Sequence, residues 1–172
     1  MQTVDKYDDR ALVLSYAAFT EEALGELLKC FLKRGDSADR LLDSSSSPLG
    51  SFGNRIKACH ALGLISNIQK TDFEILQRIR NAFAHAWDGI SLDRADIADR
   101  LKALSGDNFG TSKMTEGGRS ALIGSISVRC LELQLRIQRF RNGHEPRIED
   151  NWYHLGGAFP KGTGSTEEGE NE

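Results

Sequence analysis

Residues 9–33, DRALVLSYAAFTEEALGELLKCFLK, indicate the fold more clearly than any other stretch of the chain. Its apolar side chains recur four and three residues apart. On an α-helix this spacing places them on one face, whereas a half-buried strand would alternate apolar and polar residues. We therefore predict a long helix whose apolar stripe faces the core. Arg34 and Gly35 supply the basic last turn and the glycine that typically end a helix. The stripe consists of Leu12, Tyr16, Phe19, Ala23, Leu27 and Phe31.

Helical spacing continues through the rest of the chain. We predict a second helix over residues 51–66 and a third over residues 71–86, where Thr71-Asp72-Phe73-Glu74 resembles a capping box. Ser91 can cap a fourth helix, and a last helix covers residues 115–141. The inward residues of these last two helices are Ile97, Leu101, Leu104, Leu122, Ile126, Cys130, Leu133, Ile137 and Phe140.

The predicted fold class is all-α, because no segment alternates in the manner of a strand. A length of 172 residues suits one domain with one core, and short links after the second and third helices favour antiparallel neighbours. We predict a single-domain bundle of about five helices over residues 1–155. Residues 156–172 consist largely of Gly, Ser, Thr and Glu and are expected to be a disordered acidic tail.

The charge of the chain argues against nucleic-acid binding by bulk positive charge. The formal net charge is −3, and residues 161–172 hold one Lys and four Glu, 1 − 4 = −3, so the remainder is formally neutral. Residues 112–147 hold seven basic and three acidic residues, a local balance of 7 − 3 = +4. Within them Arg129, Arg136 and Arg139 recur on nearly one helix face, and we predict that this exposed stripe binds a partner. A merely solvated face is the alternative.

Cysteine usage and the start of the chain indicate a cytoplasmic protein. Cys30, Cys59 and Cys130 are far apart and form no C-x-x-C pair, which fits buried, reduced thiols. The first residues lack the basic and apolar regions of a signal peptide, and no apolar run approaches the roughly 20 residues that span a membrane. Because the histidines lack metal-ligand spacing and no phosphate-loop motif is present, we expect neither a metal nor a cofactor.

Residues 78–85, RIRNAFAH, are the segment best suited to chemistry. On a helix Asn81 and His85 are one turn apart and share a face, and the long Arg80 side chain can curl toward the imidazole. Arginine can hold a phosphate while histidine exchanges a proton, so Arg80, Asn81 and His85 are candidate catalytic residues for RNA cleavage. The alternative is structural: Asn81 and His85 would hydrogen-bond a neighbouring loop, and Arg80 would pair with a carboxylate.

A helix-turn-helix formed by the second and third helices is a weaker possibility. Recognition helices contact bases with polar side chains near their N-terminal ends. Here that end carries Asp72 and Glu74, which repel phosphate, so an ordinary packed hairpin is favoured. Adjacent charges such as Asp9-Arg10 and Asp99-Arg100 are expected to decorate solvated faces.

Four blocks of the chain form a further pattern. They are DRALV at residues 9–13, SPLGSFGNRI at 47–56, ALGLI at 61–65 and IRNAFAH at 79–85. Together these blocks resemble the bacterial mannitol operon repressor family. Their order and spacing match the family pattern over about residues 8–105. The resemblance implies an all-helical transcriptional regulator of mannitol uptake and use that lacks a recognised DNA-binding domain and acts through a protein partner.

The block from Arg80 to His85 is also similar to the R-x4-H signature of HEPN-type helical proteins, many of which are ribonucleases. In active members two copies bring this signature to a dimer interface and form one RNA cleft. For this chain the resemblance implies a metal-independent ribonuclease in which Arg80 stabilises the phosphate, His85 exchanges the proton and Asn81 orients either.

Our leading prediction is a repressor-like regulator of carbohydrate genes that acts as a homodimer through a protein partner and without enzymatic activity. A HEPN-like ribonuclease or toxin-system protein, which would bind RNA, is the alternative. A scaffold or antitoxin-like protein without chemistry is a third possibility.

Overall fold

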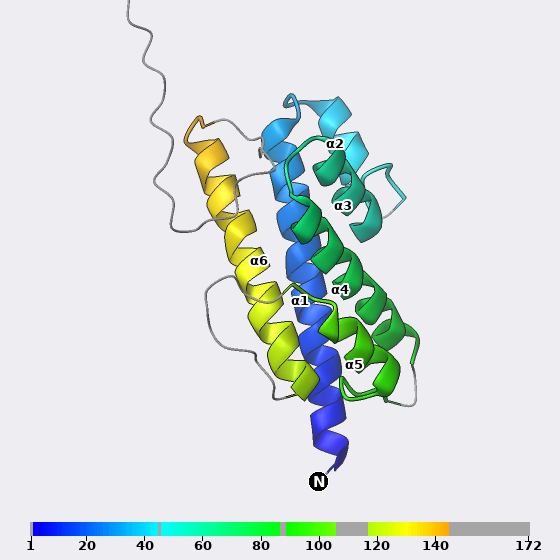
Figure 1. Ribbon diagram of the computed structural model, residues 1–172. Helices are drawn as coiled ribbons and strands as arrows, with labels where there is room; N and C mark the ends of the chain where they lie inside the picture. The colour runs from blue at the N-terminus through cyan, green and yellow to red at the C-terminus, as the bar shows by residue number, and fades with distance from the viewer. Residues whose placement is uncertain (1, 45, 87–88, 106–116, 145–172) are drawn as a thin grey trace, which may run out of the picture.

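The computed structural model describes residues 2–44, 46–86, 89–105 and 117–144, and these form an all-α bundle (Figure 1). The predicted fold class is confirmed, since the described residues contain helices and no strand. Residues 156–172, the predicted tail, lie outside the described residues. The helices are α1 (Gln2–Phe31), α2 (Asp36–Leu42), α3 (Phe52–Ala61), α4 (Asn67–His85), α5 (Ala95–Lys102) and α6 (Gly117–Arg141).

The described residues contain six helices rather than about five, because the short α2 was not predicted. It has seven residues, of which only Ala38 and Leu42 are buried, so it is too short to show a helical period. Gly35 precedes it with φ 139°, a backbone conformation that favours glycine. The predicted stop at Gly35 therefore also starts the next helix.

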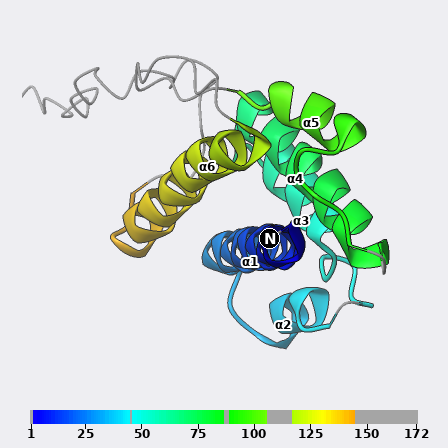
Figure 2. The same ribbon diagram turned by 90° about the horizontal axis from the view of Figure 1, so that it is seen from below.

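Helix α1 lies at the centre, with α6, α2 and the α3–α4 pair on different sides of it (Figure 2). The hydroxyl groups of Tyr16 and Ser127 are 2.7 Å apart, and near the other end Arg141 bonds Glu26, so α1 and α6 run parallel. Helix α4 runs in the opposite direction, because Arg10 near the start of α1 bonds carbonyl groups at the end of α4. Figure 1 shows the same directions.

The antiparallel arrangement predicted after the second and third helices is present. Arg55 and Cys59 of α3 follow α1 in the same direction, since they donate to Glu21 O and Leu24 O respectively. Helix α4 is antiparallel to α1 and therefore to α3. Helix α5 returns along α4, with Arg100 bonded to the carbonyl of Arg78.

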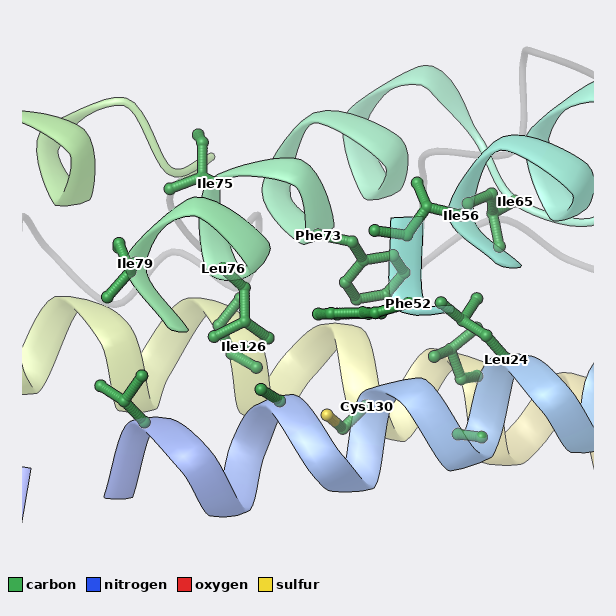
Figure 3. Packing of buried hydrophobic residues seen from close by; sticks show 14 of the residues in the cluster. Leu24, Phe52, Ile56, Ile65, Phe73, Ile75, Leu76, Ile79, Ile126 and Cys130 are labelled. Carbon is green, nitrogen blue, oxygen red and sulfur yellow. The ribbon is translucent and has the colours of Figure 1, made fainter. Parts of the chain in front are cut away.

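One core joins all of these helices (Figure 3). Phe73 and Leu76 of α4 are fully buried, and Phe52 of α3, Leu24 of α1 and Ile126 of α6 surround them. The inward residues predicted for α5 and α6 are buried, except that Phe140 is partly buried and meets Phe31 edge to face. Cys59 and Cys130 are buried as predicted, whereas Cys30 is only half-buried.

Phe19 departs from the predicted stripe. It was expected to face the core with its neighbours Tyr16 and Ala23, but 44% of its surface is exposed. The core-facing residues of α1 are centred on Val13, Ala17 and Leu24, and Phe19 lies well round the helix from them. The apolar stripe of α1 is therefore wider than the surface that the other helices cover.

The N-terminus of α4 also differs from the prediction. Ser66, not Thr71, is the N-cap: its side chain accepts from the Gln69 amide while the Gln69 side chain accepts from the Ser66 amide, which completes a capping box. Thr71 lies inside the helix and donates to Asn67 O. The predicted cap at Ser91 is likewise wrong, since α5 begins at Ala95 and Ser91 accepts from the amide of Asp93.

The pair Asp9-Arg10 does not lie on a solvated face, contrary to expectation. Asp9 is 7% exposed and accepts from the Leu92 amide and from Arg119. Arg10 donates to Ala86 O and Ala84 O. The first resembling block therefore joins α1 to the end of α4, to the segment before α5 and to α6.

Arg55, in the second resembling block, has an equally structural role. Its guanidinium donates to Leu49 O, Glu21 O and Leu42 O, and so joins α3 to the preceding segment, α1 and α2. Gly25 leaves the room, because a Cβ there would lie 2.9 Å from Nη1 of Arg55.

Candidate functional site at the end of α4 and on α6

The predicted catalytic residues lie in the last two turns of α4. His85 is the final residue of the helix and is exposed, while Arg80 and Asn81 are half-buried. Arg80 Nη1 donates to Asn81 Oδ1 at 3.1 Å. The His85 side chain makes no hydrogen bond within the described residues. The structural alternative, in which Asn81 and His85 bond a loop and Arg80 pairs with a carboxylate, is therefore not what the described residues form.

Arg10 of α1 fixes the backbone around His85. It binds the carbonyl groups of Ala84 and Ala86, which flank His85, at 3.4 and 2.9 Å. Carbonyl groups at a helix C-terminus have no partner within the helix, and a cation placed there satisfies them and opposes the negative end of the helix dipole. The exposed imidazole consequently extends from a backbone that is held on both sides.

The three arginines predicted as one exposed stripe on α6 lie in different environments. Arg129 is 3% exposed, so the prediction that it is exposed is wrong. Arg136 is half-buried and donates to Leu64 O and Gln69 Oε1. Arg139 is also half-buried and lies in the last turn of α6. Their near-common side of the helix faces the start of α4 more than it faces solvent.

Arg129 and Asp72 form a buried ion pair between α6 and α4. Arg129 Nε lies 2.8 Å from Asp72 Oδ2, and their side chains are 3% and 0% exposed. The other oxygen of Asp72 accepts from the amide and hydroxyl of Ser105. Arg129 also donates to both oxygens of Glu132, which in turn accepts from Gln69 Nε2 at 2.8 Å. Both buried charges are thus paired and hydrogen-bonded, as burial requires.

The protonation of Arg129 reflects this environment. Burial alone lowers the pKa of its guanidinium, but the hydrogen bonds and charges of Asp72 and Glu132 outweigh burial and raise the pKa above its ordinary value. Arg129 is therefore a permanently charged structural residue.

The same network explains why α4 is not presented as a recognition helix. Gln69 and Asp72, in the first turns of α4, are 2% and 0% exposed because α6 and Ser105 cover them. A recognition helix needs this part of its surface free to enter the major groove. The packed hairpin that the sequence favoured is the observed arrangement.

Sequence reasoning missed a set of exposed apolar residues. Among the described residues, the large hydrophobic side chains that are exposed all lie on α1 and α6. A signal for them is present in the sequence: between residues 120 and 138 the only charged residues are Arg129, Glu132 and Arg136, which share one side of the helix. The exposed residues are Phe19, Ile123, Leu131 and Leu135.

Two further predictions concern what the described residues contain. They hold no group of three or more His, Cys, Asp or Glu side chains arranged for a metal ion. Within the same ranges, no helix combines the length and apolar character needed to cross a bilayer.

No protein-family model matches this chain, and no curated protein matches it. A solved structure does match: a chain of the X-ray structure of the MtlR–HPr complex from Escherichia coli, with a TM-score of 0.51 and 19% sequence identity. The match covers 76% of this chain and 88% of that chain. At this identity the likeness shows a shared helical fold, and that fold is the one implied by the four resembling blocks.

Proposed function

We propose that this chain is a transcriptional regulator of carbohydrate uptake genes, of the mannitol type, that acts by binding a protein rather than DNA. The observation that carries the proposal is the fold shared with a chain of the MtlR–HPr complex over most of both chains. The first two resembling blocks support it because they carry residues that connect helices of that fold: Asp9 and Arg10 in the first, and Arg55 in the second. The covered N-terminal half of α4 supports binding of a protein over binding of DNA.

The proposed partner is an HPr protein, the kind named with the similar fold. For its binding surface, the C-terminal part of α6 is the best supported of the predicted residues, because Arg139 and Arg141 add positive charge there and Arg129 is buried. Complementary charge at the edge of an interface mainly raises the association rate and selects the partner. We therefore assign Arg139 to this edge and Arg129 to the interior.

Isothermal titration calorimetry with purified HPr from the same organism tests the proposal. We expect one HPr per chain, and we expect Arg139→Glu to weaken binding about tenfold. Lys102→Glu is the matched control, because it makes the same charge change at a side chain that is 76% exposed on α5. Absence of binding heat at all concentrations would contradict HPr as the partner. An equal loss of affinity in both variants would contradict the assignment of Arg139 to the binding surface.

RNA cleavage remains a second candidate function, supported by the exposed, unbonded His85 beside the Arg80–Asn81 pair within the described residues. In such a reaction the 2′-oxygen would bond to the adjacent phosphorus as the bond from phosphorus to the 5′-oxygen of the next nucleotide breaks. His85 would accept the proton of the 2′-hydroxyl or donate one to the leaving 5′-oxygen, and Arg80 would stabilise the phosphate charge. Incubation of the full chain with RNA in the presence of EDTA tests this function. Cleavage that His85→Ala abolishes, with the melting temperature unchanged, would establish it. Intact RNA would contradict this second function, and transcriptional regulation would then be the one remaining proposal.

A further inference from the structure

One side of α6 carries no charged residue over about five turns. At 100° per residue, Arg129, Glu132 and Arg136 fall within a narrow sector that faces α4, where they bond Asp72, Gln69 and Leu64. Leu131 lies about 200° round the helix from Arg129. The sector that faces away from α4 consists of Ser120, Ala121, Ile123, Gly124, Ser127, Val128, Leu131, Gln134, Leu135 and Gln138.

Helix α1 extends this uncharged surface. Tyr16 and Thr20 lie on either side of Phe19 and reach α6 through Ser127 and Cys130, at 2.7 and 3.5 Å. Phe19 is therefore at the height of the middle of α6, beside the turns that carry the exposed Ile123 and Leu131. We define the α1–α6 apolar face as Phe19, Ile123, Leu131 and Leu135, which are 44%, 37%, 55% and 46% exposed.

This concentration is what distinguishes the face. Single exposed apolar residues are ordinary on protein surfaces. Here the large exposed apolar residues of the described chain gather on two adjacent helices, in a protein with 27% charged residues. Exposed large apolar side chains that gather on neighbouring helices in this way indicate a site of association.

We propose that the α1–α6 apolar face binds the same face of a second copy of this chain. A two-fold contact places one surface against itself, so any charge within it meets a like charge or must find an opposite one nearby. The uncharged sector of α6 avoids that repulsion by its composition. An apolar, uncharged surface can therefore pack against a copy of itself without bringing like charges together.

One end of the face carries charges that are complementary as well. Glu22 and Glu26 belong to α1 and Arg139 and Arg141 to α6, and they lie at the same end because Arg141 bonds Glu26 at 3.2 Å. A two-fold axis along the helices would set α1 of one copy opposite α6 of the other. At that end the acidic residues of α1 in each copy would then face the basic residues of α6 in its partner copy.

The size of the face sets the expected strength of the contact. Residues 120–138 rise about 28 Å along the helix, and two packed helices present a surface roughly 20 Å wide. The resulting area is on the order of 500 Å² per copy, at the small end of specific interfaces. We therefore expect a monomer–dimer equilibrium in the micromolar range rather than a permanent dimer.

Sedimentation equilibrium on the full chain tests the proposal. From about 1 to about 500 µM, the average mass should rise from 19.0 kDa toward twice that value. Leu131→Glu, which places a carboxylate at the centre of the face, should raise the dissociation constant at least tenfold. Ala95→Glu is the matched control, since it adds the same charge at the exposed first residue of α5 and should leave the equilibrium unchanged.

Folding is controlled in the same experiment. Leu131 is more than half exposed, so both variants should melt at the temperature of the unsubstituted chain, and Leu131→Gln should weaken the dimer less than Leu131→Glu. A chain that remains monomeric throughout, or a dimer that Leu131→Glu leaves intact, would overturn the proposal. If the chain is monomeric and Leu131→Glu abolishes HPr binding instead, the face serves the protein partner: the second-copy proposal is then wrong and the proposed function stands.

Discussion

At the scale of single residues, the buried Asp72–Arg129 pair shows how a residue suited to binding can serve structure instead. Arg129 was selected because three arginines recur on one side of a helix, and that regularity is real. Its cause is the start of α4 and the link before it, which lie along that side: α4 presents Asp72 and Gln69, and the link presents Leu64 O. A periodic charge pattern on a helix thus predicts a common neighbour, but it does not distinguish solvent from protein.

Removing one member of this pair should be costly. We expect Asp72→Ala to lower the free energy of unfolding by about 3 to 5 kcal/mol, because it leaves the Arg129 charge buried and unpaired on that side and removes the acceptor for Ser105. Urea unfolding followed by circular dichroism measures this loss. Asp99→Ala, in an exposed pair with Lys102, should change it by less than about 0.5 kcal/mol. Equal effects of the two substitutions would contradict the structural role of Asp72.

The Cys59 thiol gives a prediction for alkaline solution. Burial is the main cause that raises its pKa from 9.0 to about 12, although Arg136 and Arg55 lower it somewhat. Because the unfolded chain loses this proton first, the stabilising effect is fully present below pH 9 and is lost as the pH rises from about 9 toward 12. The free energy of unfolding should therefore decline over that range, and the decline should be shallower in Cys59→Ala.

Thiol labelling checks the same property directly. At pH 8 the folded protein should be labelled by iodoacetamide at Cys59 far more slowly than the urea-unfolded protein, because the reactive thiolate is scarce and the side chain is inaccessible. Mass spectrometry of peptides resolves the three cysteines. Rapid labelling of Cys59 in the folded state would show that the core opens readily.

At the scale of elements, the beginning of α4 illustrates competition between two local signals. Ser66-x-x-Gln69 and Thr71-x-x-Glu74 both have the composition of a capping box. The structure uses the first, and Gln69 is fixed there by contacts with Glu132 and Arg136 of α6. These partners are distant in sequence, so local reasoning had no means of weighing them.

The two candidate caps make opposite predictions for mutation. Ser66→Ala should lower the free energy of unfolding by about 1 kcal/mol, because the Gln69 amide loses its acceptor. Thr71→Ala should have almost no effect, since Thr71 is exposed and inside the helix, where alanine has the better helix propensity. Thermal melting of both variants decides the matter. A larger loss for Thr71→Ala would restore the capping box predicted at that position.

At the scale of the whole molecule, the distribution of charge argues against DNA binding by bulk positive charge. The chain carries a net charge of −3, and of the basic residues concentrated near its last helix Arg129 is buried and Arg136 is engaged with α4. These two arginines are then unavailable for phosphate contacts, and a net negative charge weakens the salt-dependent attraction on which DNA binding depends.

We therefore expect little affinity for duplex DNA. In 150 mM salt, fluorescence anisotropy with a labelled duplex should show no saturation up to about 100 µM protein, a range in which basic DNA-binding proteins already bind without sequence specificity. A dissociation constant below about 10 µM that weakens steeply with salt would contradict this expectation. It would also count against the proposed action through a protein partner.

Much of the architecture followed from the sequence by itself. The all-α class, the single core and most inward residues of α5 and α6 depend on apolar periodicity, which is a property of neighbouring residues and is set before any tertiary contact forms. The locations of the arginines and of the R-x4-H motif on helices followed in the same way. The short α2 was not predicted because its seven residues make only about two turns, too few to establish a period.

What only the tertiary structure decided is which side of each helix meets a partner. Phe19 and Arg129 show this most clearly. The large apolar side chain of Phe19 is exposed because α6 does not cover that side of α1. The charged side chain of Arg129 is buried because its side of α6 packs against α4. Asp9 and Arg10 changed from expected surface charges to internal connections for the same reason. A helical period determines that side chains share a face, but the packing of distant segments determines whether that face is covered by protein or by water.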